Sequence, residues 1–154
     1  MAGTLVFVSL LTWLLYRQQR HRHAVQARVK TEIALAAQVF EDSYDGILVT
    51  DADCRILRVN AAFTVSTGYT QAEVQGKTPR LLGSGLHGKD FYKTMWTAVR
   101  RDGRWQGEVV NRRKNGQAYH ERLAISTVLD ARGQVLHYIG MFAVTAGLNI
   151  EKKE

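Results

Sequence analysis

The sequence predicts an α+β domain in which a five-stranded antiparallel sheet carries short helices on one face. Two strands, several short helices, one longer helix and then three strands follow one another along the chain, and this order carries the prediction. The chain has 154 residues, 45% of them hydrophobic and 23% charged, as is ordinary for a globular protein. The length suits one domain and, with this composition, excludes collagen, low-complexity disorder and a polytopic membrane protein.

The first half of the domain predicts a hairpin followed by short helices. Residues 46–51 and 55–59 have the apolar, β-branched composition of two strands. Asn60 is placed to cap a short helix that ends at Gly68. Residues 70–73 read Thr-Gln-Ala-Glu, the pattern of a capping box at the start of a second helix. A glycine-rich loop follows.

The second half predicts one longer helix and three strands. Residues 90–101 have helical periodicity, and residues 105–114, 117–129 and 135–144 read as strands. Asn-Gly at positions 115–116 is the strongest hairpin signal in the chain. The last strand is apolar on both faces. We therefore expect the helices to cover one face of the sheet, and the N-terminal helix or a partner chain to cover the other.

Strict alternation predicts which side chains of each of two strands share one face. They are Trp105, Gly107, Val109 and Asn111 in the first strand, and Tyr119, Glu121, Leu123 and Ile125 in the second. We expect Trp105, Asn111 and Glu121 to face one pocket.

The N-terminal residues 2–16 contain no charge and include Trp13 and Tyr16 near their end. A helix of this length spans about 22 Å, short of the ~30 Å hydrocarbon core of a bilayer. Residues 1–30 hold five basic residues and no acidic one, so this segment carries most of the net charge of +7. A basic flank stays on the cytoplasmic side of a membrane. We interpret residues 1–16 as a membrane anchor, with a buried core helix and a nucleic-acid-binding arm as the alternatives.

An apolar stripe follows the anchor at helical spacing, at Val25, Val29, Ile33, Ala36 and Phe40. Such a stripe packs on the following domain or on a second copy of itself. The predicted organisation is an anchor, a basic flank and linker helix at 17–33, a domain at 34–146, and a tail or the start of an output helix at 147–154.

Seven short motifs in order resemble the PAS family. They are residues 39–43 (VFEDS), 46–51 (GILVTD), 59–63 (VNAAF), 67–69 (TGY), 105–108 (WQGE), 111–116 (NRRKNG) and 137–140 (HYIG). The resemblance implies a PAS fold and a sensory role, as in membrane-tethered histidine kinases, diguanylate cyclases, cyclic-di-GMP phosphodiesterases and chemoreceptors. It also implies that the basic run at 112–114 is a solvated strand end before a hairpin rather than a nucleic-acid site.

The resemblance therefore implies the input module of a bacterial signalling protein. We expect a single-pass anchor in the inner membrane, or the last helix of a larger membrane domain, with the PAS domain cytoplasmic. A homodimer through the N-terminal helix and the outer sheet face is expected, and a cofactor-free dimerisation module is the alternative function. No catalytic or metal-binding arrangement is visible, so kinase or cyclic-di-GMP activity would belong to another domain.

The resemblance also bears on cofactors. In the photosensory LOV branch a cysteine attacks the flavin, and Pro79 stands at that position here, which argues against a photoreceptor. Of the three flavin-edge amides in that branch, Asn111 is matched, whereas Glu121 and Phe142 replace the other two. FAD in a redox sensor is a candidate, and haem is disfavoured because His87 is expected in an exposed loop.

The candidate cofactor residues are Trp105, Asn111, Tyr119, Glu121, Arg80 and Phe142. The alternative interpretation is that the aromatic members are core, and that Asn111 and Glu121 are satisfied by backbone groups or by Arg80.

Overall fold

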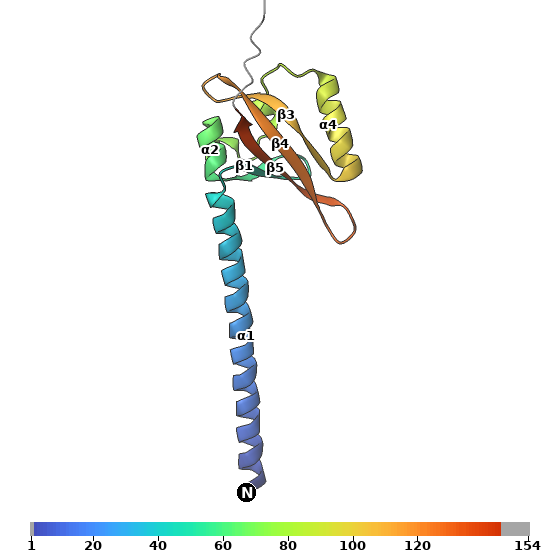
Figure 1. Cartoon of the computed structure of the whole chain (residues 1–154). Coiled ribbons are helices and arrows are strands. Elements are labelled where there is room, and N and C mark those ends of the chain that lie inside the picture. Colours follow the sequence, from blue (N-terminus) through green and yellow to red (C-terminus); the bar gives the residue numbers. More distant parts are fainter. Residues whose placement is uncertain (1, 146–154) are drawn as a thin grey trace, which may run out of the picture. The chain divides into compact units, whose positions relative to one another are not determined.

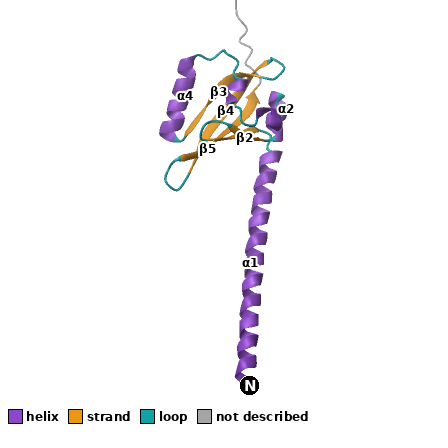
Figure 2. Ribbon diagram, turned by 180° about the vertical axis from the view of Figure 1, so that it is seen from behind, coloured by secondary structure: helices purple, strands orange, loops and turns teal. Residues whose placement is uncertain are grey.

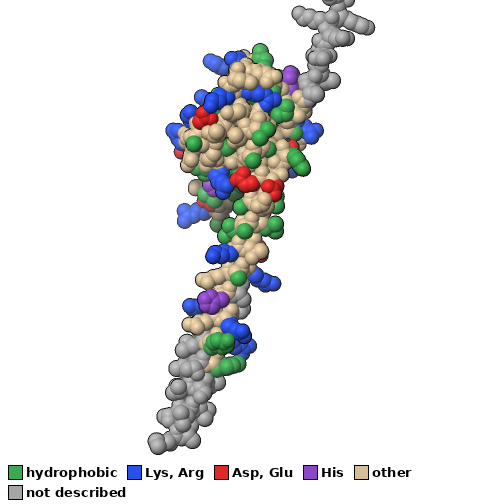
Figure 3. Space-filling model, turned by 90° about the vertical axis from the view of Figure 1, so that its left-hand side faces the viewer, with side chains coloured by type: hydrophobic (Ala, Val, Ile, Leu, Met, Phe, Trp, Pro, Cys, Tyr) green, Lys and Arg blue, Asp and Glu red, His purple; other side chains and the backbone are tan. Residues whose placement is uncertain are grey.

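The computed structural model describes residues 2–145, without the side chains at positions 2–12, 14, 15, 21 and 24. It contains two compact units, divided after Val39. The first unit is most of helix α1 (Ala2–Asp42), so the predicted anchor and linker form one continuous helix. Figure 3 shows blue Lys and Arg and purple His side chains along α1. Within residues 2–145, no helix combines the length and the apolar character needed to cross a membrane.

The second unit has the predicted order of elements (Figures 1 and 2). Its strands are β1 (Gly46–Asp51), β2 (Ile56–Val59), β3 (Arg104–Arg112), β4 (Ala118–Leu129) and β5 (Val135–Thr145). Its helices are α2 (Ala61–Thr67), α3 (Gln71–Val74), the 3₁₀ turn η1 (Pro79–Leu82) and α4 (Lys89–Asp102). The strands form one antiparallel sheet in the order β2-β1-β5-β4-β3. The predicted five-stranded α+β fold is therefore confirmed.

The helix boundaries follow the predicted signals. Asn60 caps α2 by accepting a hydrogen bond from the Phe63 N–H at 3.0 Å, and Gly68 ends the helix with φ of 80°. Thr70 and Glu73 form both bonds of the predicted capping box at α3. Gly103 ends α4 in the same left-handed conformation, with φ of 69°. Glycine adopts this left-handed conformation at little cost, and the predicted stop at Gly68 is confirmed.

The core lies between one face of the sheet and the four helical segments of the second unit. One cluster joins Phe63 of α2, Val74 of α3 and Leu82 of η1 to Tyr119 and Phe142 of the sheet. A second cluster joins Met95 and Val99 of α4 to Ile125 of β4. On the other face Met141 is 41% exposed. The prediction that these helices cover one face is confirmed.

Candidate functional site

A buried polar cluster lies on the inner face of the sheet, at the end where β3 finishes and β4 begins. Asn111 of β3 is paired in register with Tyr119 of β4, and Glu121 follows two residues later on the same face. Glu121 is 1% exposed and Tyr119 is 4% exposed. The Asn111 side-chain amide donates a hydrogen bond of 2.9 Å to Oε1 of Glu121. Alternation along the strands brings these three predicted residues together.

Two atoms of this cluster are buried without a hydrogen-bond partner, the Tyr119 hydroxyl and Oε2 of Glu121. Burial raises the pKa of Glu121 to about 7, because the interior disfavours the charged carboxylate. Burial and the neighbouring Glu121 carboxylate also raise the pKa of Tyr119. The Arg113 guanidinium lies 4.5 Å from the Tyr119 ring centroid. Glu121 therefore stays protonated to a higher pH than an exposed glutamate does, and the cluster offers unused hydrogen-bonding capacity.

The other predicted cofactor residues are divided between places. Phe142 lies in the same core cluster as Tyr119. Trp105 is six residues from Asn111 along β3, which corresponds to about 20 Å, and packs instead in the cluster around α4. Its ring meets Phe91 edge to face at 5.9 Å. Arg80 is exposed on η1. The structure thus groups Asn111, Tyr119, Glu121 and Phe142 but not Trp105.

These residues do not make the amide edge by which the photosensory LOV branch of the resemblance holds its flavin. Of the three amide positions expected from the resemblance, Asn111 alone is an amide, and it is bonded to Glu121. Phe142 is 2% exposed and packs edge to face on Phe63 at 6.0 Å. A Cβ added at Gly46 would fall on the Phe142 ring, so the ring fills the space over that strand. The interior at this point is hydrocarbon where the resemblance expects an amide.

The end of the predicted glycine-rich loop covers the free edge of β3, a position that the sequence did not predict. Gly83 forms an isolated bridge with Asn111, and the Ser84 hydroxyl donates to the Val110 carbonyl at 2.5 Å. The Val110 N–H donates to Nε2 of His87 at 2.8 Å. His87 is half-buried and stacks on Phe91 at 4.1 Å. The expectation of an exposed His87 is therefore wrong. Its ring accepts the hydrogen bond from the edge of β3 that a neighbouring strand would otherwise accept.

Asn60 joins the C-terminal end of α1 to the sheet. Its side-chain oxygen accepts from the Ile47 N–H at 2.8 Å as well as from the α2 cap. Its side-chain nitrogen donates to the carbonyls of Phe40, at 3.0 Å, and Asp45, at 2.9 Å. The capping role was predicted from sequence, whereas the link to α1 depends on tertiary packing. A single buried side chain therefore connects α1, β1 and α2.

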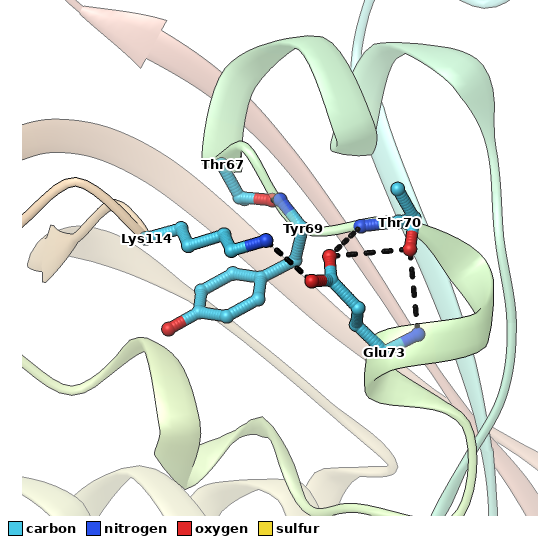
Figure 4. A network of polar contacts seen from close by, with 5 residues as sticks. All are labelled: Thr67, Tyr69, Thr70, Glu73 and Lys114. Carbon is cyan, nitrogen blue, oxygen red and sulfur yellow. Dashed lines mark hydrogen bonds and ion pairs between the residues drawn. The ribbon is translucent and has the colours of Figure 1, made fainter.

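Arg112 and Lys114 of the basic run before the β3–β4 hairpin are exposed, as predicted for a solvated strand end, and they also bind neighbouring segments. Lys114 forms an ion pair with Glu73 of the α3 capping box, as Figure 4 shows. The hydrogen bond from Lys114 lowers the pKa of Glu73 to about 2. Arg112 donates to the Ser84 carbonyl at 2.6 Å. Arg112 and Lys114 therefore fasten the hairpin to two neighbouring segments, the loop that follows η1 and α3.

An open surface hollow of about 450 Å³ lies beside this network. It is lined by Val65, Thr67, Gly68, Arg113, Lys114 and Asn115. None of the predicted cofactor residues lines it. Among the residues that the structure describes, no group of three His, Cys, Asp or Glu side chains could hold a metal ion.

Comparison with known proteins assigns the family. A family model described as the PAS fold matches residues 34–144. The chain belongs to the PAS family. Members of this family are sensory and signalling modules, so the predicted resemblance is confirmed, and the matched range lies within the predicted domain at 34–146.

Relatives and solved structures agree with this assignment. The nitrogen fixation regulatory protein of Klebsiella oxytoca is 34% identical over 101 residues, covering 66% of this chain and 20% of the relative. Phototropin-1B of Oryza sativa is 30% identical over 125 residues, covering 80% of this chain and 14% of the relative. A crystal structure of a PAS domain from Colwellia psychrerythraea matches with a TM-score of 0.69 and 20% identity, covering 73% of this chain and 96% of that one. The chain thus spans a fifth or less of the curated relatives named here.

Proposed function

We propose that this chain is the sensory input module of a larger bacterial signalling protein, of the histidine kinase or cyclic-di-GMP type. The observation that carries the proposal is the Asn60 junction, in which one buried side chain ties the end of α1 to β1 by hydrogen bonds. A change in the sheet would be transmitted to α1 through this side chain. Kinase or cyclic-di-GMP activity would belong to a part of the protein outside this chain.

The junction can be tested in the signalling protein that contains this chain. Asn60→Ser keeps the oxygen that caps α2 but is too short to reach the carbonyls of Phe40 and Asp45. We expect it to change the output activity severalfold. Asn115→Ala, at an exposed hairpin turn, is the matched control and should leave the output unchanged. Equal output from wild type and Asn60→Ser would contradict the proposed route.

We propose that the module is a homodimer formed through α1 and the outer face of the sheet. On that face Met141 of β5 pairs with Ile47 of β1, and Ile139 pairs with Val49, which makes an apolar strip. Val25, Val29 and Ile33 of α1 are also exposed. Met141→Lys should shift the chain toward monomer in analytical ultracentrifugation. Leu129→Lys, which alters an exposed leucine at the end of β4, is the control and should not.

A flavin-dependent redox sensor is the second candidate. It is favoured by the match to the nitrogen fixation regulatory protein and by the two unpartnered buried polar atoms. Absorbance of the purified chain separates the candidates. The visible bands of an oxidised flavin would support the second, and a colourless chain that still dimerises would support the cofactor-free module.

We propose that residues 2–16 tether the module at the bacterial inner membrane. The absence of charge in this segment and the basic residues that follow it support this. Extraction of cell membranes at alkaline pH tests the proposal. The chain should stay with the membrane pellet, whereas release into the supernatant would contradict the proposed tether.

A further inference from the structure

Glu121 is a buried carboxyl group without a cationic partner. The sheet neighbours in register with it are Val109 on β3 and Val144 on β5, both apolar. Its Oε1 accepts from Asn111, and its Oε2 has no partner. Among the described residues, no Lys, Arg or His lies within ion-pair distance of it. An ionised carboxylate in such a place is costly, since neither water nor a counter-charge stabilises it.

The groups that face Glu121 do not neutralise a charge on its carboxylate, so a proton is the ligand that the carboxyl group can bind. Tyr119 faces it from its own strand with an unpartnered hydroxyl, and β3 contributes the neutral amide of Asn111. Arg113, at the hairpin after β3, lies over the Tyr119 ring. Leu82 of η1 packs in the same core cluster as Tyr119. One oxygen of the carboxyl group is therefore held while the other is free to take or release a proton.

We propose that Glu121 is a proton-binding site that controls the pairing at the end of β5. When a proton from solvent binds Oε2, the new O–H can donate to the Tyr119 hydroxyl oxygen and the strand end stays closed. When the proton returns to solvent, the Tyr119 O–H can donate to Oε2. The negative charge of the carboxylate nevertheless remains between Val109 and Val144. Opening the end of β5 then lets water reach the carboxylate.

The register places this event where β5 ends. Glu121 pairs with Val144, and the neighbouring pairs are Arg122 with Ala143 and His120 with Thr145. Separating these three pairs uncovers Glu121 without disturbing the rest of the strand. The claim that this opening is an input to signalling rests on the proposed function. The opening of the β5 end itself does not.

The size of the effect follows from proton linkage. Burial raises the pKa of Glu121 from 4.5 to about 7 in the closed sheet, and opening returns the carboxyl group to water. Between these two values the open form has released a proton that the closed form retains. The opening equilibrium constant should therefore rise by about tenfold for each pH unit in this window.

Amide hydrogen exchange on the full chain tests the proposal at pH about 5.5 and about 6.5, inside the linkage window. After correction for the chemical exchange rate, residues 118–124 and 141–145 should exchange about tenfold faster at the higher pH in the wild type. Glu121→Gln keeps an acceptor for Asn111 but cannot ionise, and should lose this rise. Glu108→Gln, which removes an exposed carboxyl group from β3, should keep it. Peptides from α4 should show no rise in any of the three proteins.

Two results would overturn the proposal. The first is a rise that persists in Glu121→Gln. The second needs no variant, and so covers the case in which Glu121→Gln fails to fold. It is a carboxyl titration of the wild type, followed by ¹³C resonance, in which Glu121 ionises near 4.5 as an exposed glutamate does. If the exchange result holds but the signalling output does not respond to pH, the site stands and its role in signalling falls.

Discussion

Replacing Asn60 by alanine removes four hydrogen bonds from one side chain that is 1% exposed. The N–H groups of Ile47 and Phe63 lose the oxygen that they share, and each buried unsatisfied donor costs about 1–3 kcal/mol. The carbonyls of Phe40 and Asp45 lose a donor and lie nearer to water. We therefore expect Asn60→Ala to lower the free energy of unfolding by about 4 kcal/mol, a large share of the stability of a domain.

Asn60→Ser divides this cost into its parts. A serine hydroxyl can still accept from the Phe63 N–H and cap α2, which is worth about 1 kcal/mol, but cannot reach the other three groups. Asn60→Ser should therefore lower the free energy of unfolding by about 3 kcal/mol, about 1 kcal/mol less than Asn60→Ala does. Urea unfolding of the full chain, followed by circular dichroism, measures both values. Asn115→Ala, which removes one exposed bond to the Gln117 N–H, is the control and should cost less than about 1 kcal/mol. A loss below about 1 kcal/mol in Asn60→Ala would refute the reasoning.

Three further changes test other contacts. In the wild type, Glu121 should lower the free energy of unfolding by about 3 kcal/mol as the pH rises from 4.5 to about 7. The reason is that the native state retains a proton that the unfolded chain releases. Urea unfolding of Glu121→Gln across this pH range should lack that fall. Gly46→Ala should cost about 2 kcal/mol because its Cβ meets the buried Phe142 ring, whereas Gly88→Ala, with open space around it, should be nearly neutral in thermal unfolding. Thr70→Ala should cost about 1 kcal/mol by loss of the α3 cap, and an unchanged midpoint of unfolding would contradict the capping box.

Local signals in the sequence carried most of the fold. The Asn60 and Thr70 caps, the glycine stops and the Asn-Gly hairpin each depend on a few neighbouring residues, and each is found where it was predicted. Alternation in β3 and β4 likewise placed Asn111, Tyr119 and Glu121 on one buried face. These features follow from backbone geometry, which a short segment determines by itself.

The site was predicted less completely because its remaining features depend on tertiary contacts. Trp105 shares a face with Asn111, but the length of β3 carries it to the cluster around α4. His87 could be read as exposed because glycines surround it, yet the free edge of β3 offers its ring a hydrogen-bond donor. Nothing near Asn60 in sequence indicates that the end of α1 will come within reach of its amide. The length of a strand, its place in the sheet, and which distant segment packs beside a residue are properties of the whole domain.

The Asn60 junction on β1 and the Glu121 site on β4 are separated by one strand, β5, so a coupling between them can be measured. β5 pairs with β4 at Glu121 through Val144, and with β1 at Gly46 through Phe142, two residues earlier. Ile47, the next residue of β1, is held by Asn60. Loosening the end of β5 should therefore weaken the support of the Asn60 junction.

A double-mutant cycle of Asn60→Ser and Glu121→Gln should show an interaction energy above about 0.5 kcal/mol at pH about 8, where the wild-type carboxyl group is ionised. At pH about 4.5 the carboxyl group is protonated and resembles the amide, so the interaction should shrink toward zero. The same interaction energy at both pH values would mean that the two sites communicate by some property other than the charge of Glu121. Additivity at both values would mean that β5 does not transmit the change between the two sites.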